Sequence, residues 1–318
     1  MRCNLVMINY LIQYGEVDAM GLDGHAQNFL TYITKKKSLG VTLTLGRQND
    51  HTNWINPETA MTETYCEPIL CQLFGATKVE SVDASDYEGA TYVQNLNEEW
   101  EPSSDLANNK YSSVLDFGTL EHVFNVPQAL KSIAVSCEIG GRIIHVQTHS
   151  DFCGHGFWQF SAELFFSWYS ESNGFGNVEI FIAPLSRLDT WFRCLRPDAG
   201  RRCELTGKNV PASYILVVAN KTRDVSSLIC EQSDYVAIWD ENNSSIIKTT
   251  DASNQTMQSK LSLRRIMRRL LAKGASFLPS SLKILLVNQY HSLRNAYIPW
   301  WANRYLVKEN IKLLIERS

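Results

Sequence analysis

Apolar residues recur along the chain at two spacings, one typical of strands and the other of helices. Short β-branched or apolar runs predict strands at 41–45, 78–83, 91–93, 113–116, 142–148, 178–182 and 214–219. Between these runs, apolar residues three and four positions apart predict helices that begin near Glu67, Pro127 and Ser161. Strands that alternate with helices in this way predict an α/β fold with a Rossmann-like, doubly wound and mostly parallel sheet.

Proline and glycine residues mark the limits of two of these helices. Pro68 lies in the first turn of one helix, and Gly75 stands where its C-terminal cap is expected. The helix near Pro127 is expected to end at Gly140–Gly141.

The same pattern divides the chain into four parts. The Rossmann-like domain is expected over residues 38–221, preceded by a helical N-terminal extension at 1–37. A stretch rich in Ser, Asn, Asp and Thr predicts a polar linker at 222–260. Residues 261–318 are expected to form a basic helical C-terminal segment.

The basic helix predicted at 261–273 carries an apolar stripe with arginines around the rest of its surface. Such a helix can pack on its own domain, pair with another subunit, or lie on an anionic membrane surface. Trp300 and Trp301 favour the membrane alternative because tryptophan side chains prefer the membrane–water interface.

Composition limits the possible classes of protein. The 318 residues are 44% hydrophobic and 20% charged, with a net charge of −3, which is ordinary for a soluble globular protein and predicts no nucleic-acid partner. The 8 cysteines form no C-x-x-C pair, which argues against a zinc ribbon, and no metal site is predicted. No apolar run approaches the roughly 20 residues of a membrane span. We expect a cytoplasmic protein, with contact at the inner membrane as the alternative.

Polar or small residues follow four of the predicted strands. These residues are Gly46, Asp83, the Asn95–Asn97 stretch and Asp116. Ligands of doubly wound sheets bind beyond the carboxyl ends of the strands. An acid in the position of Asp83 is typical of domains that bind the ribose of an adenosine cofactor.

Three further motifs strengthen this interpretation. The segments are 82–85 (VDAS), 115–123 (LDFGTLEHV) and 140–144 (GGRII). Together they resemble the class I S-adenosylmethionine-dependent methyltransferases over about residues 38–221. The later segment 154–161 (GHGFWQFS) resembles a bacterial subgroup often encoded beside polysaccharide genes.

The resemblance implies a site for S-adenosyl-L-methionine. By position, Gly46 and Arg47 would lie near the amino-acid part of the cofactor, Asp83 and Ala84 near its ribose, Asn95 and Leu96 near adenine, and Asp116, Phe117 and Gly118 near its methionine part. Members of the family usually carry more than one glycine in the first loop, whereas this loop has only Gly46. Arg47 could bind the cofactor's carboxylate, or it could fill the site.

Two histidines are candidates for catalysis. A base is required only if the acceptor must lose a proton, as a sugar hydroxyl must. His155 lies between two glycines, and histidine is the residue type that most readily exchanges a proton near neutral pH, so His155 is a candidate base, with a loop anchor as the alternative. His122 is a second candidate, with a cap on the next helix as its alternative, and Glu121 is a weaker one.

Three hypotheses follow for function. The first is a methyltransferase that modifies a hydroxyl or amine of a small molecule or a glycan precursor. The second is a non-catalytic relative that uses the fold as a binding or scaffold module. The third, a nucleotide-sugar or dinucleotide enzyme, is disfavoured because no G-x-G-x-x-G follows the first strand.

Overall fold

The computed structural model describes residues 21–51, 65–101, 103–108, 110–196, 210–232, 235–236 and 305–318. The chain divides into two compact units, of which the first comprises Met1–Arg196, Pro211–Gln232 and Tyr305–Ser318. All elements described below belong to this first unit.

A nine-stranded sheet forms the centre of the unit, with the strand order β3-β2-β1-β4-β5-β8-β6-β7-β9. The strands are β1 (Gly40–Leu45), β2 (Ala76–Asp83), β3 (Tyr92–Val93), β4 (Tyr111–Phe117), β5 (Cys137–Ser150), β6 (Phe175–Pro184), β7 (Thr190–Cys194), β8 (Ser213–Lys221) and β9 (Leu306–Asn310). The first five strands have the doubly wound order 3-2-1-4-5, in which the strand order reverses between β1 and β4 while the strands stay parallel. The α/β fold class predicted from the sequence is therefore present.

The sheet is mixed, which corrects the expectation of a mostly parallel one. The four pairings that join β3, β2, β1, β4 and β5 are parallel. The four that join β5, β8, β6, β7 and β9 are antiparallel. Periodicity in a single strand reports its burial and not the direction of its neighbour, so the sequence could not distinguish the two halves.

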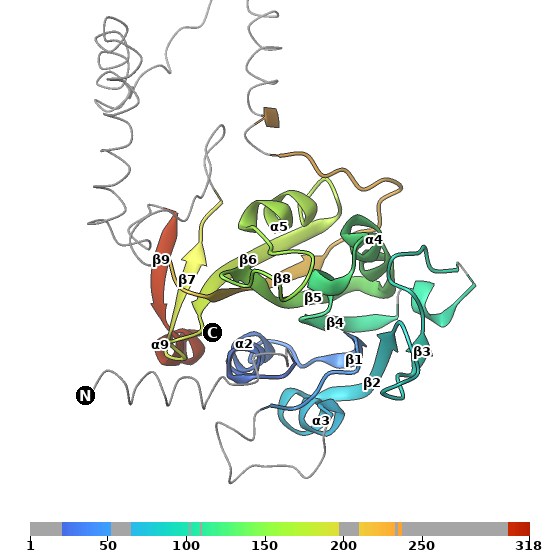
Figure 1. Cartoon of the computed structure of the whole chain (residues 1–318), viewed down its shortest axis with the longest axis horizontal. Coiled ribbons are helices and arrows are strands. Elements are labelled where there is room, and N and C mark those ends of the chain that lie inside the picture. Colours follow the sequence, from blue (N-terminus) through green and yellow to red (C-terminus); the bar gives the residue numbers. More distant parts are fainter. Residues whose placement is uncertain are drawn as a thin grey trace, which may run out of the picture. The chain divides into compact units, whose positions relative to one another are not determined.

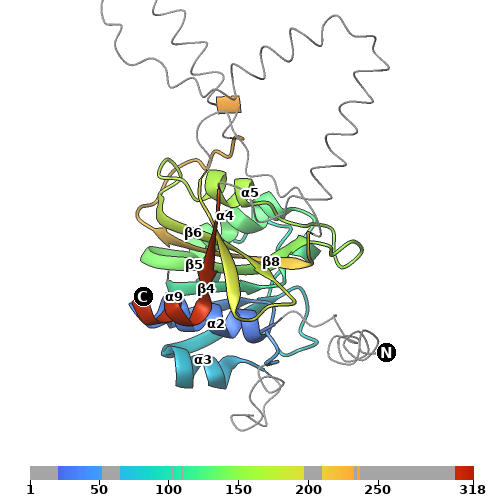
Figure 2. The same ribbon diagram turned by 90° about the vertical axis from the view of Figure 1, so that its left-hand side faces the viewer.

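Helices cover both faces of the sheet (Figures 1 and 2). One face carries α2 (Gly24–Thr34), α3 (Glu67–Phe74) and α9 (Ile311–Arg317), and the other carries α4 (Val126–Ser136) and α5 (Ala162–Trp168). Two short 3-10 helices, η3 (Asp105–Ala107) and η4 (Leu120–His122), lie in the connections on either side of β4. Gly75 caps α3 in the left-handed conformation, with φ 67°, as its position predicts.

The core extends beyond the domain limits of 38 and 221 that the sequence indicates. Phe29 and Leu30 of α2 and Ile311 and Leu314 of α9 are buried in one cluster with the sheet residue Trp191. Asp23 caps α2 by accepting a hydrogen bond from the amide of Ala26. The C-terminal segment also supplies β9, a strand that the sequence analysis did not predict.

Helix α4 ends earlier than expected. It stops at Ser136, four residues before the predicted stop at Gly140, and β5 begins at Cys137. Gly140, with φ 84°, lies where the pairing of β5 with β4 shifts register. The glycine therefore serves an irregularity in a strand and not a helix cap.

Among the described residues, no helix has the length and apolarity needed to cross a membrane. The predicted basic helix at 261–273 and the tryptophans at 300–301 lie outside the described residues, as does most of the predicted linker.

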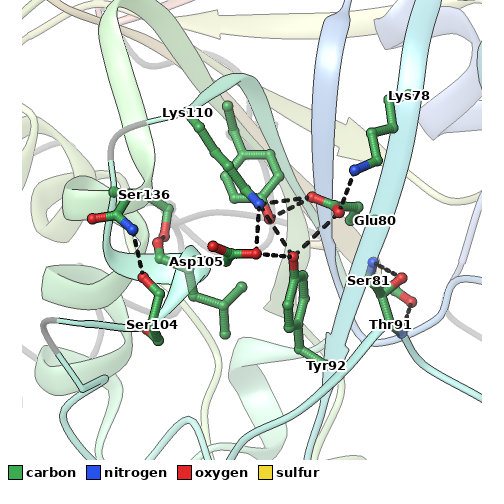
Figure 3. A network of polar contacts seen from close by, with 12 residues as sticks. Lys78, Glu80, Ser81, Thr91, Tyr92, Ser104, Asp105, Lys110 and Ser136 are labelled. Carbon is green, nitrogen blue, oxygen red and sulfur yellow. Dashed lines mark hydrogen bonds and ion pairs between the residues drawn. The ribbon is translucent and has the colours of Figure 1, made fainter.

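A polar network joins β2 to the start of β4 (Figure 3). The nearly buried carboxylate of Glu80 accepts hydrogen bonds from Tyr111 at 2.8 Å and Tyr92 at 3.2 Å, and it pairs with Lys78 at 2.7 Å and Lys110 at 3.3 Å. Burial alone would raise the pKa of Glu80, but the hydrogen bonds from Lys78, Tyr111 and Lys110 outweigh it and lower the pKa to about 2. The charged form of Glu80 therefore stabilises the fold.

This network predicts a pH-dependent loss of stability in Glu80→Gln. A lowered folded-state pKa stabilises the fold above the ordinary carboxyl pKa of 4.5, and this contribution is lost as the pH falls toward 2. At pH 7 we expect the free energy of unfolding of the variant to be roughly 2–3 kcal/mol lower than that of the unmodified protein. This difference should become smaller at about pH 3.5. Urea unfolding at both pH values measures this, with the exposed Glu99→Gln as control. An equal gap at the two pH values would contradict the assignment.

Candidate functional site

The strand order reverses between β1 and β4, and this is where the candidate site lies. The chain leaves β1 toward α3 on one face of the sheet, whereas it leaves β4 toward α4 on the other (Figure 1). Such a reversal opens a crevice at the carboxyl ends of the two strands, and ligands of doubly wound folds bind there. The predicted site residues are considered against this position.

Gly46 stands where three strand ends converge. Its φ of 68° is a left-handed conformation that favours glycine. A Cβ at this position would lie 3.0 Å from Thr119 Oγ1, 3.3 Å from Gln48 Nε2 and 3.8 Å from Asp83 Oδ2. The structure therefore brings together the ends of β1, β2 and β4, and any ligand there would meet backbone and polar atoms.

Thr119 and Gln48 join the two central strand ends. The hydroxyl of Thr119 donates to the carbonyl of Leu45 at 2.7 Å, and the amide of Gln48 donates to the same carbonyl and, at 3.2 Å, to Thr119 Oγ1. Gln48 is almost fully buried. These hydrogen bonds fix the ends of β1 and β4 relative to each other, and the sequence analysis did not assign Gln48 to the site.

Asp83 ends β2 with a carboxylate that is partly exposed. Among the described residues, its Oδ1 accepts one long hydrogen bond, 3.4 Å, from the amide of Ser85, and its Oδ2 lies 3.8 Å from the position of a Cβ on Gly46. The backbone is fixed because the Asp83 carbonyl accepts from Gln94 N at 2.7 Å. This carboxylate can accept two hydroxyl groups of a ligand, and the neighbouring Ala84 is exposed.

Arg47 is held by protein groups. Its Nε pairs with Glu67 at 2.7 Å, its Nη1 donates to the carbonyl of Glu88 at 2.8 Å, and its guanidinium lies 3.9 Å from the centre of the Tyr65 ring. The side chain therefore braces the loops after β1 and β2. The sequence left two roles open for Arg47, binding of the cofactor's carboxylate and filling of the site, whereas these contacts favour a structural role in holding the loops.

The Asn95–Asn97 turn lies beside the segment that follows β4. The Asn95 side chain closes its own turn by accepting from Asn97 N and donating to Glu98, each at 3.0 Å. Leu96 is buried. Asn97 Oδ1 accepts from the amide of Asn125 at 2.8 Å, which ties the turn to the start of α4. The turn is therefore held at the start of α4, and its Asn95 amide already has partners.

Asp116 is a buried structural acid at the end of β4. One oxygen accepts from the amides of Thr119 and Leu120, at 3.1 and 3.3 Å, and the other lies 2.6 Å from His145 Nδ1. His145 Nε2 lies 2.6 Å from the hydroxyl of Tyr169, whose pKa burial raises. A neutral imidazole that donates from Nδ1 to the carboxylate accepts a hydrogen bond from the Tyr169 hydroxyl at Nε2.

The side chains of Asp116, His145 and Tyr169 are almost completely excluded from solvent, as is that of Phe117. Asp116 and Phe117 therefore position the loop that begins at Gly118, where φ is 89°. The Asp116–His145–Tyr169 chain was missed from the sequence because its members lie on β4, β5 and the end of α5, far apart along the chain.

The glycine-rich loop after β5 is fastened to η4. The carbonyl of Glu121 accepts from the amides of Phe157 at 2.8 Å and Trp158 at 3.3 Å, and the Trp158 indole donates to the carbonyl of Val123 at 3.0 Å. A Cβ on Gly156 would lie 2.7 Å from the Glu121 carbonyl oxygen. Only glycine permits this approach, which brings His155 beside Glu121.

Glu121, His122 and His155 form one cluster. The Glu121 side chain is completely buried, and its Oε1 lies 3.7 Å from His155 Nε2 and 4.0 Å from His122 Nε2. Burial raises the pKa of Glu121, while the nearby His155 imidazole opposes this shift. The structure thus unites the two catalytic candidates with the carboxylate that the sequence analysis ranked below them.

Three exposed aromatic side chains stand beside this cluster. Phe124 is 69% exposed, Phe157 66% and Trp158 42%, and the Phe124 ring contacts the other two with centroid distances of 5.8 and 6.2 Å. Exposed aromatic groups that contact one another offer an apolar surface to a ligand.

A cavity of about 740 Å³ lies elsewhere in the described part of the chain, among the end of α5, the start of β6 and the end of β7. Arg193, which pairs with Glu179 and Glu309, lines it. None of the predicted site residues borders this cavity.

The fold places the chain in the broad class of doubly wound α/β proteins. No model of a known protein family matches the sequence, and the search of curated proteins gave no match.

Solved structures that resemble the chain include one nematode protein and two bacterial proteins. Phosphoethanolamine N-methyltransferase 2 of Haemonchus contortus is 13% identical over 48% of this chain, with a TM-score of 0.34, and the chain spans only 38% of its length. A Burkholderia thailandensis 1,6-didemethyltoxoflavin-N1-methyltransferase is 13% identical over 63% of this chain and 79% of its own, with a TM-score of 0.34. The YcgJ protein of Bacillus subtilis is 10% identical over 63% of this chain and 100% of its own, with a TM-score of 0.36. Scores and identities this low establish neither the family nor the activity of this chain.

The close approach at Gly156 predicts a local effect of Gly156→Ala. The added methyl would push the loop away from Glu121, so the variant should lose roughly 1–3 kcal/mol of stability. The Phe157 amide should also lose protection from hydrogen exchange, because it donates to the Glu121 carbonyl. Gly176→Ala is the control, since its nearest neighbour is a Thr222 methyl at 3.3 Å. Unchanged protection at Phe157 would contradict this description of the loop.

Proposed function

We propose that the protein is an S-adenosyl-L-methionine-dependent methyltransferase that modifies a hydroxyl or amine of a small molecule. The observation that carries the proposal is the convergence of Gly46, Asp83 and Thr119 at the reversal of strand order. The sequence motifs in the same loops, which resemble those of class I methyltransferases, supply the identity of the cofactor.

The residues of the crevice have the chemistry that such a cofactor requires. Asp83 would accept hydrogen bonds from the two ribose hydroxyls, since both its oxygens have capacity for them. Gly46 would let the backbone approach the amino-acid part of the cofactor. Leu96, buried beside the Asn95 turn, would border the adenine, and the Asn95 amide would stabilise this turn instead of contacting the base.

The loop after β4 would serve the methionine part. Gly118 and Thr119 lie at its start, and Asp116 and Phe117 would hold the loop from below without contacting the cofactor. Arg47 would act in the same indirect way, by bracing the loop that contains Gly46.

Methyl transfer would be an in-line displacement. The acceptor oxygen or nitrogen attacks the methyl carbon, the carbon–sulfur bond breaks, and its electron pair stays on sulfur, which gives S-adenosylhomocysteine. The protein contributes chiefly position and orientation. The acceptor's proton would leave at the cluster of Glu121, His122 and His155. Glu121 and His122 follow Thr119 closely in the chain, and His155 lies in the same loop as the exposed Phe157.

A glycan precursor is one acceptor class with a suitable hydroxyl, and the resemblance of the 154–161 segment to a subgroup encoded beside polysaccharide genes is its support. The scaffold alternative differs from this proposal in one respect: it requires no binding of the cofactor at the crevice.

Calorimetric titration with S-adenosylhomocysteine tests the proposal. The unmodified protein should bind one molecule per chain, and Asp83→Ala should weaken binding about ten- to a hundredfold, because it removes charge-assisted hydrogen bonds worth roughly 1.5–3 kcal/mol. Asp86→Ala removes an exposed acid three residues further along and should leave the affinity unchanged.

Equal affinities of the unmodified protein and a folded Asp83→Ala variant would refute the assignment of Asp83. Failure of the unmodified protein to bind either S-adenosylmethionine or S-adenosylhomocysteine would favour the scaffold alternative.

A further inference from the structure

Three side chains of the cluster after β4 point metal-binding atoms at a common position. One carboxylate oxygen of Glu121 and one ring nitrogen each of His122 and His155 all lie within 4.8 Å of one another. Two imidazoles and one carboxylate are a donor set that Zn²⁺ and other divalent transition metals bind, with further coordination positions left open. Mg²⁺ and Ca²⁺ prefer oxygen ligands and match this set less well.

The state of Glu121 is the second observation. Its side chain is completely buried, yet neither carboxylate oxygen has a partner within hydrogen-bonding distance among the described residues. Burying a carboxylate in this way is costly unless another group compensates it. The imidazoles of His155 and His122, at 3.7 and 4.0 Å, are too distant to donate directly, but they are placed to share a cation with it.

The separations suit a small cation after a modest adjustment. Ligand atoms about 2.0–2.1 Å from a tetrahedral Zn²⁺ lie roughly 3.3 Å from one another. The side chain of His122 is 51% exposed, so its imidazole can rotate inward without disturbing the core. The same exposure leaves the remaining coordination positions accessible from solvent.

The surrounding backbone fixes the other two ligands relative to each other. The carbonyl of Glu121 accepts the amides of Phe157 and Trp158, so the residue that supplies one ligand also anchors the loop that supplies another. The amide of His155 donates to the carbonyl of Phe152 at 3.1 Å, and the two rings are in contact. Preorganisation of this kind is typical of metal sites.

We propose that Glu121, His122 and His155 bind one divalent transition-metal cation such as Zn²⁺. The cation neutralises the buried carboxylate and presents open coordination positions beside the aromatic residues Phe124 and Phe157. This departs from the sequence-based expectation of no metal site, since the ligands come from η4 and from a loop 33 positions further on.

A consequence for the reaction rests on the proposed function. An acceptor hydroxyl bound to the cation would lose its proton to solvent near neutral pH, because a divalent metal lowers the pKa of a bound hydroxyl. The resulting oxygen would attack the methyl carbon. His122 and His155 would then act as ligands and not as free bases.

Metal binding is tested on the full chain, stripped of metal and titrated calorimetrically with Zn²⁺. One equivalent should bind per chain, and Glu121→Gln, His122→Gln and His155→Gln should each weaken binding by about tenfold or more. Cys153→Ser is the matched control, because this exposed thiol lies two residues from His155 and is the nearest competing ligand in the sequence. It should bind Zn²⁺ like the unmodified protein. Substitution with Co²⁺ should give d–d absorption without a sulfur-to-cobalt charge-transfer band.

Unchanged Zn²⁺ affinity in a folded His122→Gln variant would overturn the proposal, as would a loss of binding in Cys153→Ser. His122 is exposed, so this variant decides the matter even if Glu121→Gln does not fold.

Titration of the same samples with S-adenosylhomocysteine separates the two proposals. Cofactor binding without Zn²⁺ binding overturns the metal site alone, whereas Zn²⁺ binding without cofactor binding overturns the methyltransferase assignment and the hydroxyl chemistry that rests on it.

Discussion

The buried carboxylate of Asp116 is the constraint on which the candidate site depends. A carboxylate removed from solvent must be compensated by hydrogen bonds, and Asp116 obtains them from the amides of Thr119 and Leu120 and from His145. These bonds fix the turn that leaves β4. The turn places Thr119 against the end of β1, and two residues later the carbonyl of Glu121 anchors the 154–158 loop. One carboxylate thus orders both sides of the site.

This arrangement divides the crevice into two regions that share the β4 loop. Thr119 faces the region of Gly46 and Asp83, which we assign to the methyl donor. Glu121, two residues further on, faces His122 and His155, which we assign to the acceptor. Because a single short turn supplies both residues, the two proposed regions are adjacent in the structure.

The sequence predicts the parallel half of the sheet well, because its strands and helices alternate locally and end at recognisable residues such as Asp83 and Gly75. It predicts the antiparallel half less well. The direction in which β7 and β9 pair depends on partners more than a hundred residues apart, and no local pattern encodes it. The same limit applies to the site. His155 and Glu121 are conspicuous one by one, but their contact depends on Gly156, whose role is visible only when its distance to the Glu121 carbonyl is known.

The central claim is that a methyl donor binds at the reversal of strand order, within reach of the Glu121 cluster. A crystal structure of the protein grown with S-adenosylhomocysteine tests it most directly. We predict that the ribose hydroxyls lie within hydrogen-bonding distance of Asp83, that the amino-acid part passes over Gly46, and that the sulfur faces the side of the crevice occupied by His155. The ligand bound instead in the cavity between α5 and β6, or a crevice without ligand at saturating concentration, would contradict the account.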